Sequence, residues 1–504
     1  MSEEQKNRIV SRRDMLKMTG AAGVGLLASA CVQSAPAQPQ VIEKVVTVEV
    51  EKEVEKVVTV EVEKEVIKEV ESEPGAEAAA ITVQGALWVL QGKDFHDSYN
   101  EYLRAKISEY AASKDWPLDI SYIAGYTGGT GEVEKIAAAV QSGNPPDMIL
   151  HTLSAVELRN LYALDPVSDV VEQIESVFGK AAPFMYTEYN LEGQWWAVPY
   201  HQRAGGGYYR KDIFDEAGID LQQTRTYDKL AEQALEVSKP DEEMYGWGMT
   251  VNRSGDGDSV INRVKTGWGA AWQDETGQYI TANSPEMIEA MNFIKDIYTN
   301  PKWEPMLPPG VLSWNDISNN EAYLGGKIAY TENAGTVYAK AVIDENPVAP
   351  VTSYLKQPGG PVIQEFVVVG GKNWMILRGS KNSAASKDTI LHFTADLGRY
   401  DEMLASSPAY ALPCYVDLWD MSEVVKASEI TQLQKGAALD ESGINANIYP
   451  GPNTPAMAAI VASGVWNDMV NAILTGTATE DAVADAHQRM VDIFKEFGLP
   501  GEKA

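Results

Sequence analysis

From Ile81 onward, apolar runs typical of buried strands alternate with stretches whose apolar residues recur every three or four positions. The runs ITVQGALWVL (81–90), LDISYI (118–123) and DMIL (147–150) predict three strands. The spacing of apolar residues over 133–140 predicts a helix before the third strand. Strands that alternate with helices indicate an α/β fold built on a parallel sheet.

Ligands of such a sheet bind outside the carboxyl ends of its strands. The loops 91–94, 124–131 and 151–155 follow the three predicted strands, so we expect binding residues there. Gly125 to Gly131 is rich in glycine but lacks the lysine of a phosphate-binding loop and the G-x-G-x-x-G spacing. We interpret it as a flexible turn.

A helix start is well marked further along the chain. Ser284, Pro285 and Glu286 combine a capping side chain, a proline at the first helical position and an early acid. One face of the predicted helix then carries apolar side chains, namely Met287, Met291, Ile294 and Tyr298. We therefore expect that face to pack in a core.

The segment from Glu192 to Asp220 has the composition of a crossover between domains. A turn at Glu192 and Gly193 leads into aromatic and β-branched residues, which predict a strand. Pro199 interrupts that strand, and three glycines at 205–207 precede a helix-like stretch. Because proline cannot donate to a central ladder and glycine frees the backbone, the chain is expected to leave one domain here and enter another.

Several motifs occur in the order seen in one known family. They are Gly193, Trp196, Val198 and Pro199, then Tyr209, Lys211, Asp212 and Gly218, with Pro146-Asp147 and Leu164-Asp165-Pro166 before them and Ser380-Lys381-Asn382 after them. In this order the chain resembles extracellular solute-binding proteins of family 1, the sugar and oligosaccharide binders of ABC importers, over residues 81–500. The resemblance implies a two-lobed periplasmic-binding-protein fold of the type II kind, with hinge crossovers.

By this resemblance the chain crosses between lobes near residues 199, 370 and 412. Lobe 1 is expected to comprise 81–199 plus 371–412, and lobe 2 to comprise 200–370 plus 413–504. Gly370 and Gly371 fit a hinge that absorbs backbone rotation.

The first 30 residues are typical of an export signal. Arg12 and Arg13 resemble a twin-arginine motif, and the apolar run that follows is too short to span a bilayer. Cys31 is the expected lipidation site, although Ala28-Ser29-Ala30 also satisfies an ordinary A-x-A cleavage site. Residues 31–80 are expected to form an extended tether, because the 12-residue repeat EKVVTVEVEKEV has a period of two and carries no heptad.

Composition excludes several classes of function. A net charge of −31 argues against nucleic acid as a partner, because phosphate binding needs clusters of lysine and arginine. The five histidines are scattered and only two cysteines are present, so we expect no metal site and no cofactor. No G-x-S-x-G motif occurs. A pair of glycosidase carboxylates among the 72 acidic residues remains an alternative.

Aromatic usage favours a carbohydrate ligand. The chain has 12 Trp and 23 Tyr but only 9 Phe, and sugars are bound by flat rings together with hydrogen-bonding side chains. From the resemblance and from position in the predicted loops and crossovers, the candidate ligand-binding residues are Gln91, Lys93, His151, Tyr200, Gln202, Arg203, Trp268, Glu332, Asn333 and Trp374. Arg203 replaces an acid of the maltose-binding branch, which favours either an acidic sugar or a salt bridge across the cleft.

We therefore predict a non-enzymatic, monomeric substrate-binding component of an ABC importer. It is expected to capture a sugar or oligosaccharide between two lobes and to deliver it to the transmembrane permease subunits. A lipid on Cys31 would hold it at the outer face of the cytoplasmic membrane. The alternatives are a secreted carbohydrate-active enzyme, and the same fold with a non-sugar solute such as a polyol phosphate.

Overall fold

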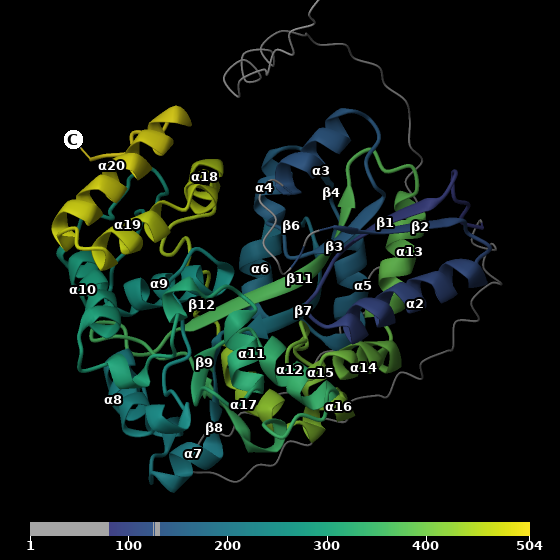
Figure 1. Ribbon diagram of the computed structural model, residues 1–504. Coiled ribbons are helices and arrows are strands. Elements are labelled where there is room, and N and C mark those ends of the chain that lie inside the picture. The colour runs from purple at the N-terminus through teal and green to yellow at the C-terminus, as the bar shows by residue number, and fades with distance from the viewer. Residues whose placement is uncertain (1–79, 124, 126–131, 504) are drawn as a thin grey trace, which may run out of the picture. The chain divides into compact units, whose positions relative to one another are not determined.

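The computed structural model describes residues 80–123, 125 and 132–503, within a compact unit that spans Glu77–Ala504 (Figure 1). The predicted signal, Cys31 and nearly all of the predicted tether lie outside the described residues. Most of the glycine-rich loop, residues 126–131, also lies outside them.

The first sheet contains the three strands that the sequence predicts. β1 (Leu87–Gly92) pairs in parallel with β2 (Leu118–Ile123) on one side and with β3 (Met148–His151) on the other. The long strand β11 (Val367–Leu377) runs antiparallel to β3, and with β12 (Gly443–Ile444) on its other side the order is β12-β11-β3-β1-β2. The α/β prediction is thus confirmed, with an antiparallel strand from late in the chain added to a parallel sheet.

Four short strands and a longer one complete the pairing in this region. β4 (Leu164–Asp165) and β7 (Val198–Ala204) both pair with β11, and β12 (Gly443–Ile444) lies on the edge. β5 (Asn190–Leu191) and β6 (Gln194–Trp195) form a separate hairpin around the turn predicted at residues 192 and 193.

Ten helices pack with this sheet and bury the first core cluster, which draws its residues from 87–204 and 367–438. They are α2 (Asp97–Ser113), α3 (Glu132–Gln141), α4 (Ala155–Asn160), α5 (Ser168–Phe178), α6 (Pro183–Tyr189), α13 (Ser383–Thr394), α14 (Leu397–Ser406), α15 (Leu418–Met421), α16 (Glu423–Ala427) and α17 (Glu429–Ala438). Within α2, Tyr99, Leu103 and Ile107 face the core at the helical spacing that the sequence shows.

A second sheet follows the crossover. β8 (Gly206–Arg210) lies between β9 (Tyr330–Glu332) and β10 (Thr352–Lys356), and both pairings are antiparallel. The helices that accompany this sheet are α7 (Lys211–Glu216), α8 (Tyr227–Glu236), α9 (Gly255–Gly267), α10 (Pro285–Thr299), α11 (Ser318–Leu324), α12 (Thr336–Ile343), α18 (Pro455–Ser463), α19 (Val465–Leu474) and α20 (Thr479–Glu496).

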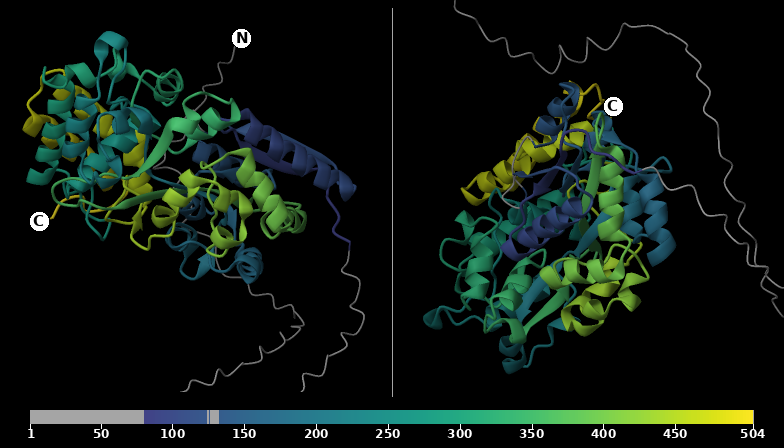
Figure 2. Two further views of the ribbon diagram at one scale, coloured as in Figure 1. Left: turned by 90° about the horizontal axis from the view of Figure 1, so that it is seen from below. Right: turned by 90° about the vertical axis from the view of Figure 1, so that its right-hand side faces the viewer.

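The second core cluster lies among the second sheet and most of these helices, whereas α11 and α12 contribute to a third, smaller cluster. Its buried residues come from 209–355 and 448–494. In the left view of Figure 2, the teal helices and the yellow C-terminal helices lie together, at the opposite end from the purple helix α2. Among the described residues, one stretch, Pro455–Leu474, is long and apolar enough to cross a membrane. Gly464 divides it into α18 and α19, and both helices contribute to the second core.

The two buried clusters divide later in the chain than the boundary expected at residue 412. Leu412, Cys414 and Trp419 belong to the first cluster, as do Ala437 and Ala438, whereas Ile448 belongs to the second. Ile430 belongs to a third, smaller cluster with Tyr208. The physical reason is that the segment at 412 pairs with the crossover strand, where Gln202 and Leu412 exchange backbone hydrogen bonds of 2.9 and 3.0 Å. The last passage between the clusters therefore runs through β12.

Candidate functional site

A cavity of about 330 Å³ lies where the crossover strands meet elements of both core clusters. Its wall combines the loop after β3, the end of α6, strands β7 and β11, helix α9 and the segment that follows β12. The volume falls in the range of small-molecule sites. The carboxyl end of β3 supplies Thr152, Leu153 and Ser154, as the rule for open α/β sheets predicts.

Neutral hydrogen-bonding side chains and two aromatic rings dominate this wall. The polar members are Thr152, Ser154, Ser259, Asn445, Asn447 and Asn453, and the aromatic members are Phe184 and Tyr189. Hydroxyl and amide groups can both donate and accept, and aromatic rings offer an apolar face. The wall therefore has the chemistry that a polyhydroxylated ligand requires.

The segment after β12 is held in place from α9. Lys265 is completely buried and donates a hydrogen bond of 2.9 Å from Nζ to the carbonyl of Ala446. Burial lowers the pKa of Lys265 to about 7. Because Ala446 is fixed, its neighbours Asn445 and Asn447 are positioned at the cavity wall.

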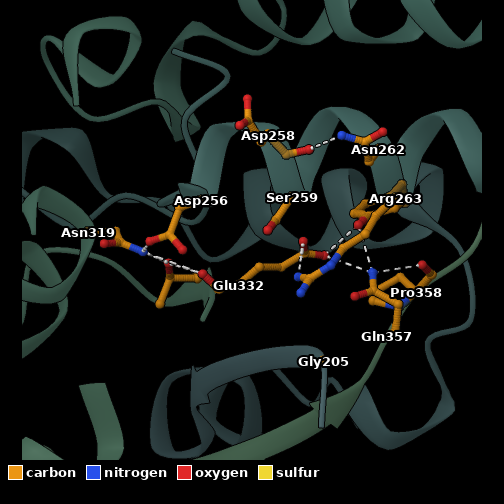
Figure 3. Close-up of polar contacts among 12 residues, drawn as sticks. Gly205, Asp256, Asp258, Ser259, Asn262, Arg263, Asn319, Glu332, Gln357 and Pro358 are labelled. Carbon is orange, nitrogen blue, oxygen red and sulfur yellow. Dashed lines mark hydrogen bonds and ion pairs between the residues drawn. The ribbon is translucent and has the colours of Figure 1, made fainter. Parts of the chain in front are cut away.

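Two arginines also line the cavity, and Arg263 is part of a buried network (Figure 3). Its Nη1 donates to Oε2 of Glu332 over 2.8 Å, and the two side chains are 8% and 2% exposed. The other carboxylate oxygen of Glu332 accepts from the hydroxyl of Tyr227 at 2.6 Å and from Nε2 of Gln357 at 3.1 Å. Both carboxylate oxygens of Glu332 therefore have hydrogen-bond partners, and one of these partners is Arg263.

Arg203 reaches the cavity from β7, and its guanidinium packs on an aromatic ring rather than on a carboxylate. Its guanidinium lies over the ring of Tyr410, 5.9 Å from the ring centre. Nε is buried without a hydrogen-bond partner, and among the described residues no ion pair includes Arg203. The hydroxyl of Tyr410 donates in turn to Asp94, over 3.0 Å.

Asp94 and Lys372 form a buried ion pair beside Tyr410. Their charged atoms are 2.8 Å apart and their side chains are 3% and 4% exposed. Burial alone would raise the pKa of Asp94, but the charge of Lys372 and its hydrogen bond hold that pKa well below its usual range. Burial lowers the pKa of the neighbouring His96 to about 4 and of His201 to about 3. Both histidines are therefore neutral at pH 7.

Glu188, at the end of α6, is the one acidic residue among the described residues of the cavity wall. Burial raises its pKa to about 7. A glycosidase needs two carboxyl groups on either side of the bond that it cleaves. The wall offers a single carboxyl group, and over 80–123, 125 and 132–503 no cluster of three His, Cys, Asp or Glu could hold a metal ion.

Of the ten predicted binding residues, Arg203 is the one that the described cavity wall contains. Trp268 caps α9 and packs against Phe293 in the second core, with ring centres 4.5 Å apart. Tyr200 and Trp374 pack together in the first core and are completely buried. These three aromatic side chains fill space between elements, so they do not face the cavity.

Four other polar candidates are buried and form hydrogen bonds within the protein. Gln91 and Gln202 are completely buried and donate to the carbonyls of Asn100 and Pro413. Asn333 is also buried, where its Oδ1 accepts from the backbone N–H groups of Gly335 and Val337 at the start of α12, and Glu332 binds Arg263 behind the wall.

His151 and Lys93 do not line the cavity. The Nδ1 atom of His151 accepts from the backbone N–H of Leu153 over 3.0 Å, which shapes the loop that enters the cavity wall. Lys93 is exposed, in the loop after β1.

The sequence pattern described as bacterial extracellular solute-binding protein matches residues 96–392. The arabinooligosaccharide-binding protein of Halalkalibacterium halodurans is 30% identical over 162 residues, which are 32% of this chain and 34% of that protein. The mannitol-binding protein of Pseudomonas aeruginosa is 28% identical over 172 residues, 34% of this chain and 38% of that protein. The chain thus matches about a third of the length of either relative.

The fold is similar to that of maltose-bound MalE3 of T. maritima. The TM-score is 0.67 with 19% sequence identity, and the likeness covers 80% of this chain and 98% of that one. At this identity the likeness shows the fold alone. It confirms the periplasmic-binding-protein fold that the order of motifs implies.

Proposed function

Because this chain belongs to the bacterial extracellular solute-binding protein family, we propose that it captures a carbohydrate or polyol in the cavity beside the crossover strands. The transmembrane subunits of an ABC importer would then receive that ligand. The family binds solutes and is non-catalytic, which contradicts the alternative of a secreted carbohydrate-active enzyme.

The observation that carries the proposal is the composition of the cavity wall. Hydroxyl and amide side chains reach it from both sides of the crossover, for example Ser154 from the first group of elements and Ser259 from the second. A polyhydroxylated ligand would bind both sides at once. The relatives are named for an arabino-oligosaccharide and for mannitol, and the similar structure holds maltose.

We take the two core clusters as the two lobes of the mechanism. One lobe comprises 81–205 and 367–438, and the other comprises 206–366 and 448–503. Strands β7 and β11 join them as the hinge. A ligand that contacts both lobes favours their closed arrangement over the open one, and the permease would recognise that arrangement.

The N-terminal residues supply the proposed anchor. A twin-arginine signal with Arg12 and Arg13, a lipid on Cys31 and the repetitive tether would hold a monomer at the outer face of the cytoplasmic membrane. Mass spectrometry of the protein from a membrane fraction tests this directly. A diacylglyceryl group on Cys31 supports the anchor, whereas a free N-terminus cut at Ala30 refutes it.

Thermal unfolding tests the binding function. The purified full-length chain is heated with a panel of neutral and acidic sugars, oligosaccharides and polyols, because a ligand that binds only the folded state raises the midpoint. We expect a rise with one ligand that is recovered chemically unchanged. If no carbohydrate or polyol raises the midpoint and a polyol phosphate or a peptide does, the proposed ligand class is wrong.

A further inference from the structure

Two guanidinium groups lie over the same face of the crossover strands. Arg203 of β7 is paired with Gly370 of β11, and a Cβ added to Gly370 would lie 3.3 Å from Nη2 of Arg203. Gly205, two residues further along the chain, donates its N–H to the carbonyl of Val368. A Cβ added to Gly205 would lie 3.2 Å from Nη2 of Arg263. Both glycines leave room for a guanidinium against the backbone.

The two groups therefore lie against neighbouring positions of the crossover, since Gly205 follows Arg203 by two residues. Arg203, Gly205, Gly370 and Arg263 all belong to the cavity wall. Two guanidinium groups thus line one small volume, although Nη1 of Arg263 already donates to Glu332.

The charges of these two arginines are balanced differently. Glu332 neutralises Arg263 at 2.8 Å. For Arg203, the acid that acts on it over a longer distance is Asp94, whose charge is already balanced by Lys372 at 2.8 Å. The cluster of Arg203, Asp94 and Lys372 carries a net positive charge, and among the described residues Arg203 has Tyr410 as a polar neighbour but forms no ion pair.

A ligand that fills the cavity removes water from Arg203. A neutral ligand leaves the guanidinium desolvated without an opposite charge, which is costly, whereas a carboxylate supplies both the charge and a matching pair of acceptor oxygens. Glu188 also lines the cavity, but no ion pair joins it to Arg203 among the described residues.

We propose that this protein selects an acidic carbohydrate, a uronate or an aldonate, whose carboxylate binds Arg203 beside Arg263 over Gly205 and Gly370. This inference rests on the proposed function, since it names the substrate class of the same cavity. The other polar residues of the wall then bind the hydroxyl groups of the ligand.

The test uses pairs of ligands that differ in the carboxylate. Isothermal titration of the purified full-length chain compares D-galacturonate with D-galactose, D-glucuronate with D-glucose, and D-mannonate with D-mannitol. In at least one pair we expect the acid to bind roughly 10- to 100-fold more tightly, which is the worth of a charge-assisted hydrogen bond. This comparison needs no variant and so does not depend on the folding of one.

Arg203→Gln then assigns the preference to one side chain. We expect the variant to reduce the affinity for the acid at least 10-fold more than the affinity for the neutral partner. Arg489→Gln is the matched control, because Arg489 of α20 forms an exposed ion pair with Asp468 of α19 and lies outside the cavity wall. Circular dichroism confirms that both variants are folded.

The possible results distinguish a wrong ligand class from a wrong function. A neutral sugar that binds as tightly as its acid overturns the acidic ligand and leaves a carbohydrate-binding protein. An equal loss of both ligands in Arg203→Gln also overturns it. If neither member of any pair nor any oligosaccharide binds, the proposed function fails as well.

Discussion

Asn453 donates a hydrogen bond of 2.9 Å from Nδ2 to Oγ of Ser154. Ser154 precedes α4, whose residues contribute to the first core, and Asn453 precedes α18, whose residues contribute to the second. Both residues line the cavity. One hydrogen bond between side chains thus joins the two proposed lobes at the rim of the proposed binding site.

This contact between the proposed lobes predicts an effect on ligand affinity. Asn453→Ala removes the hydrogen bond without touching the cap of α4, whereas Ser154→Ala would also remove the acceptor of the Glu157 N–H. Because the closed arrangement loses a stabilising contact, we expect Asn453→Ala to weaken ligand affinity about 2- to 10-fold. Isothermal titration measures the change.

The matched control for this prediction is Asn300→Ala. Asn300 ends α10 and its amide donates to Asp296, outside the cavity wall. Its replacement is expected to leave ligand affinity unchanged. An affinity of Asn453→Ala equal to that of the wild type contradicts a role for the contact in closure.

A second prediction concerns the buried pair of Asp94 and Lys372. Lys372→Met leaves the carboxylate of Asp94 buried and unpaired, so the free energy of unfolding should fall by about 3–5 kcal/mol. Lys426→Met breaks an exposed pair with Glu423 and should change it by less than about 1 kcal/mol. Urea unfolding measures both variants. A loss below about 1 kcal/mol for Lys372→Met would show that Asp94 is not dependent on its partner.

Local patterns predicted the elements of the fold well. The runs at 87–90, 118–123 and 148–150 are strands, and Ser284 caps α10 by accepting the N–H of Met287 at 3.1 Å. These features depend on alternation and on one capping side chain, both of which a sequence shows directly. The passage between cores near Ala438 could not be found in this way, because it depends on a pairing between Gln202 and Leu412.

The candidate cavity and the predicted binding residues agree only in part. Residues 152–154, after the third predicted strand, and Arg203 of the crossover lie on the cavity wall, whereas residues 91–94 do not. The aromatic candidates Tyr200, Trp268 and Trp374 are core residues, because composition does not tell which face of an element a ring occupies.

The residues that sequence reasoning missed come from distant segments. Glu188, Arg263 and Asn453 meet only through the fold. A single local signal was present, since Asn445 and Asn447 lie close together in a short loop. Their position still depends on Lys265, which contacts Ala446. These two residues are 181 positions apart in the sequence, so a local pattern cannot predict their contact.

A third prediction follows from the pKa of Glu188, which burial raises from 4.5 to about 7. Between these values the folded protein keeps a proton that the unfolded chain has released, so its contribution to stability is present below pH 4.5 and is lost as the pH rises to 7. Compared with Glu188→Gln, the wild type should lose about 1–3 kcal/mol over this window.

Thermal unfolding of both proteins between pH 4.5 and 9 tests this prediction. The difference between them removes the contributions of other groups whose pKa burial raises to about 7, which include Glu157 and Asp256. The difference should become constant above pH 8. A difference that does not depend on pH would show that Glu188 is well solvated.

The glycines of the crossover give the fourth prediction. Gly207 is required by close packing rather than by backbone flexibility at a hinge. A Cβ added to it would lie 2.2 Å from the hydroxyl oxygen of Tyr330. Tyr330 is completely buried in the second core and cannot move aside without leaving a void. Gly207→Ala should therefore lower the free energy of unfolding by about 3 kcal/mol.

Gly436→Ala is the matched control for the same substitution. Gly436 lies inside α17 and a Cβ added to it would meet nothing within 4 Å, so alanine should raise stability by roughly 0.5–1 kcal/mol through its higher helix propensity. Urea unfolding compares the two variants. Opposite signs would show that Gly207 is kept for the close approach of Tyr330. If Gly207→Ala is as stable as the wild type, the crossover has room for a side chain, and freedom of the backbone is the better explanation of its glycines.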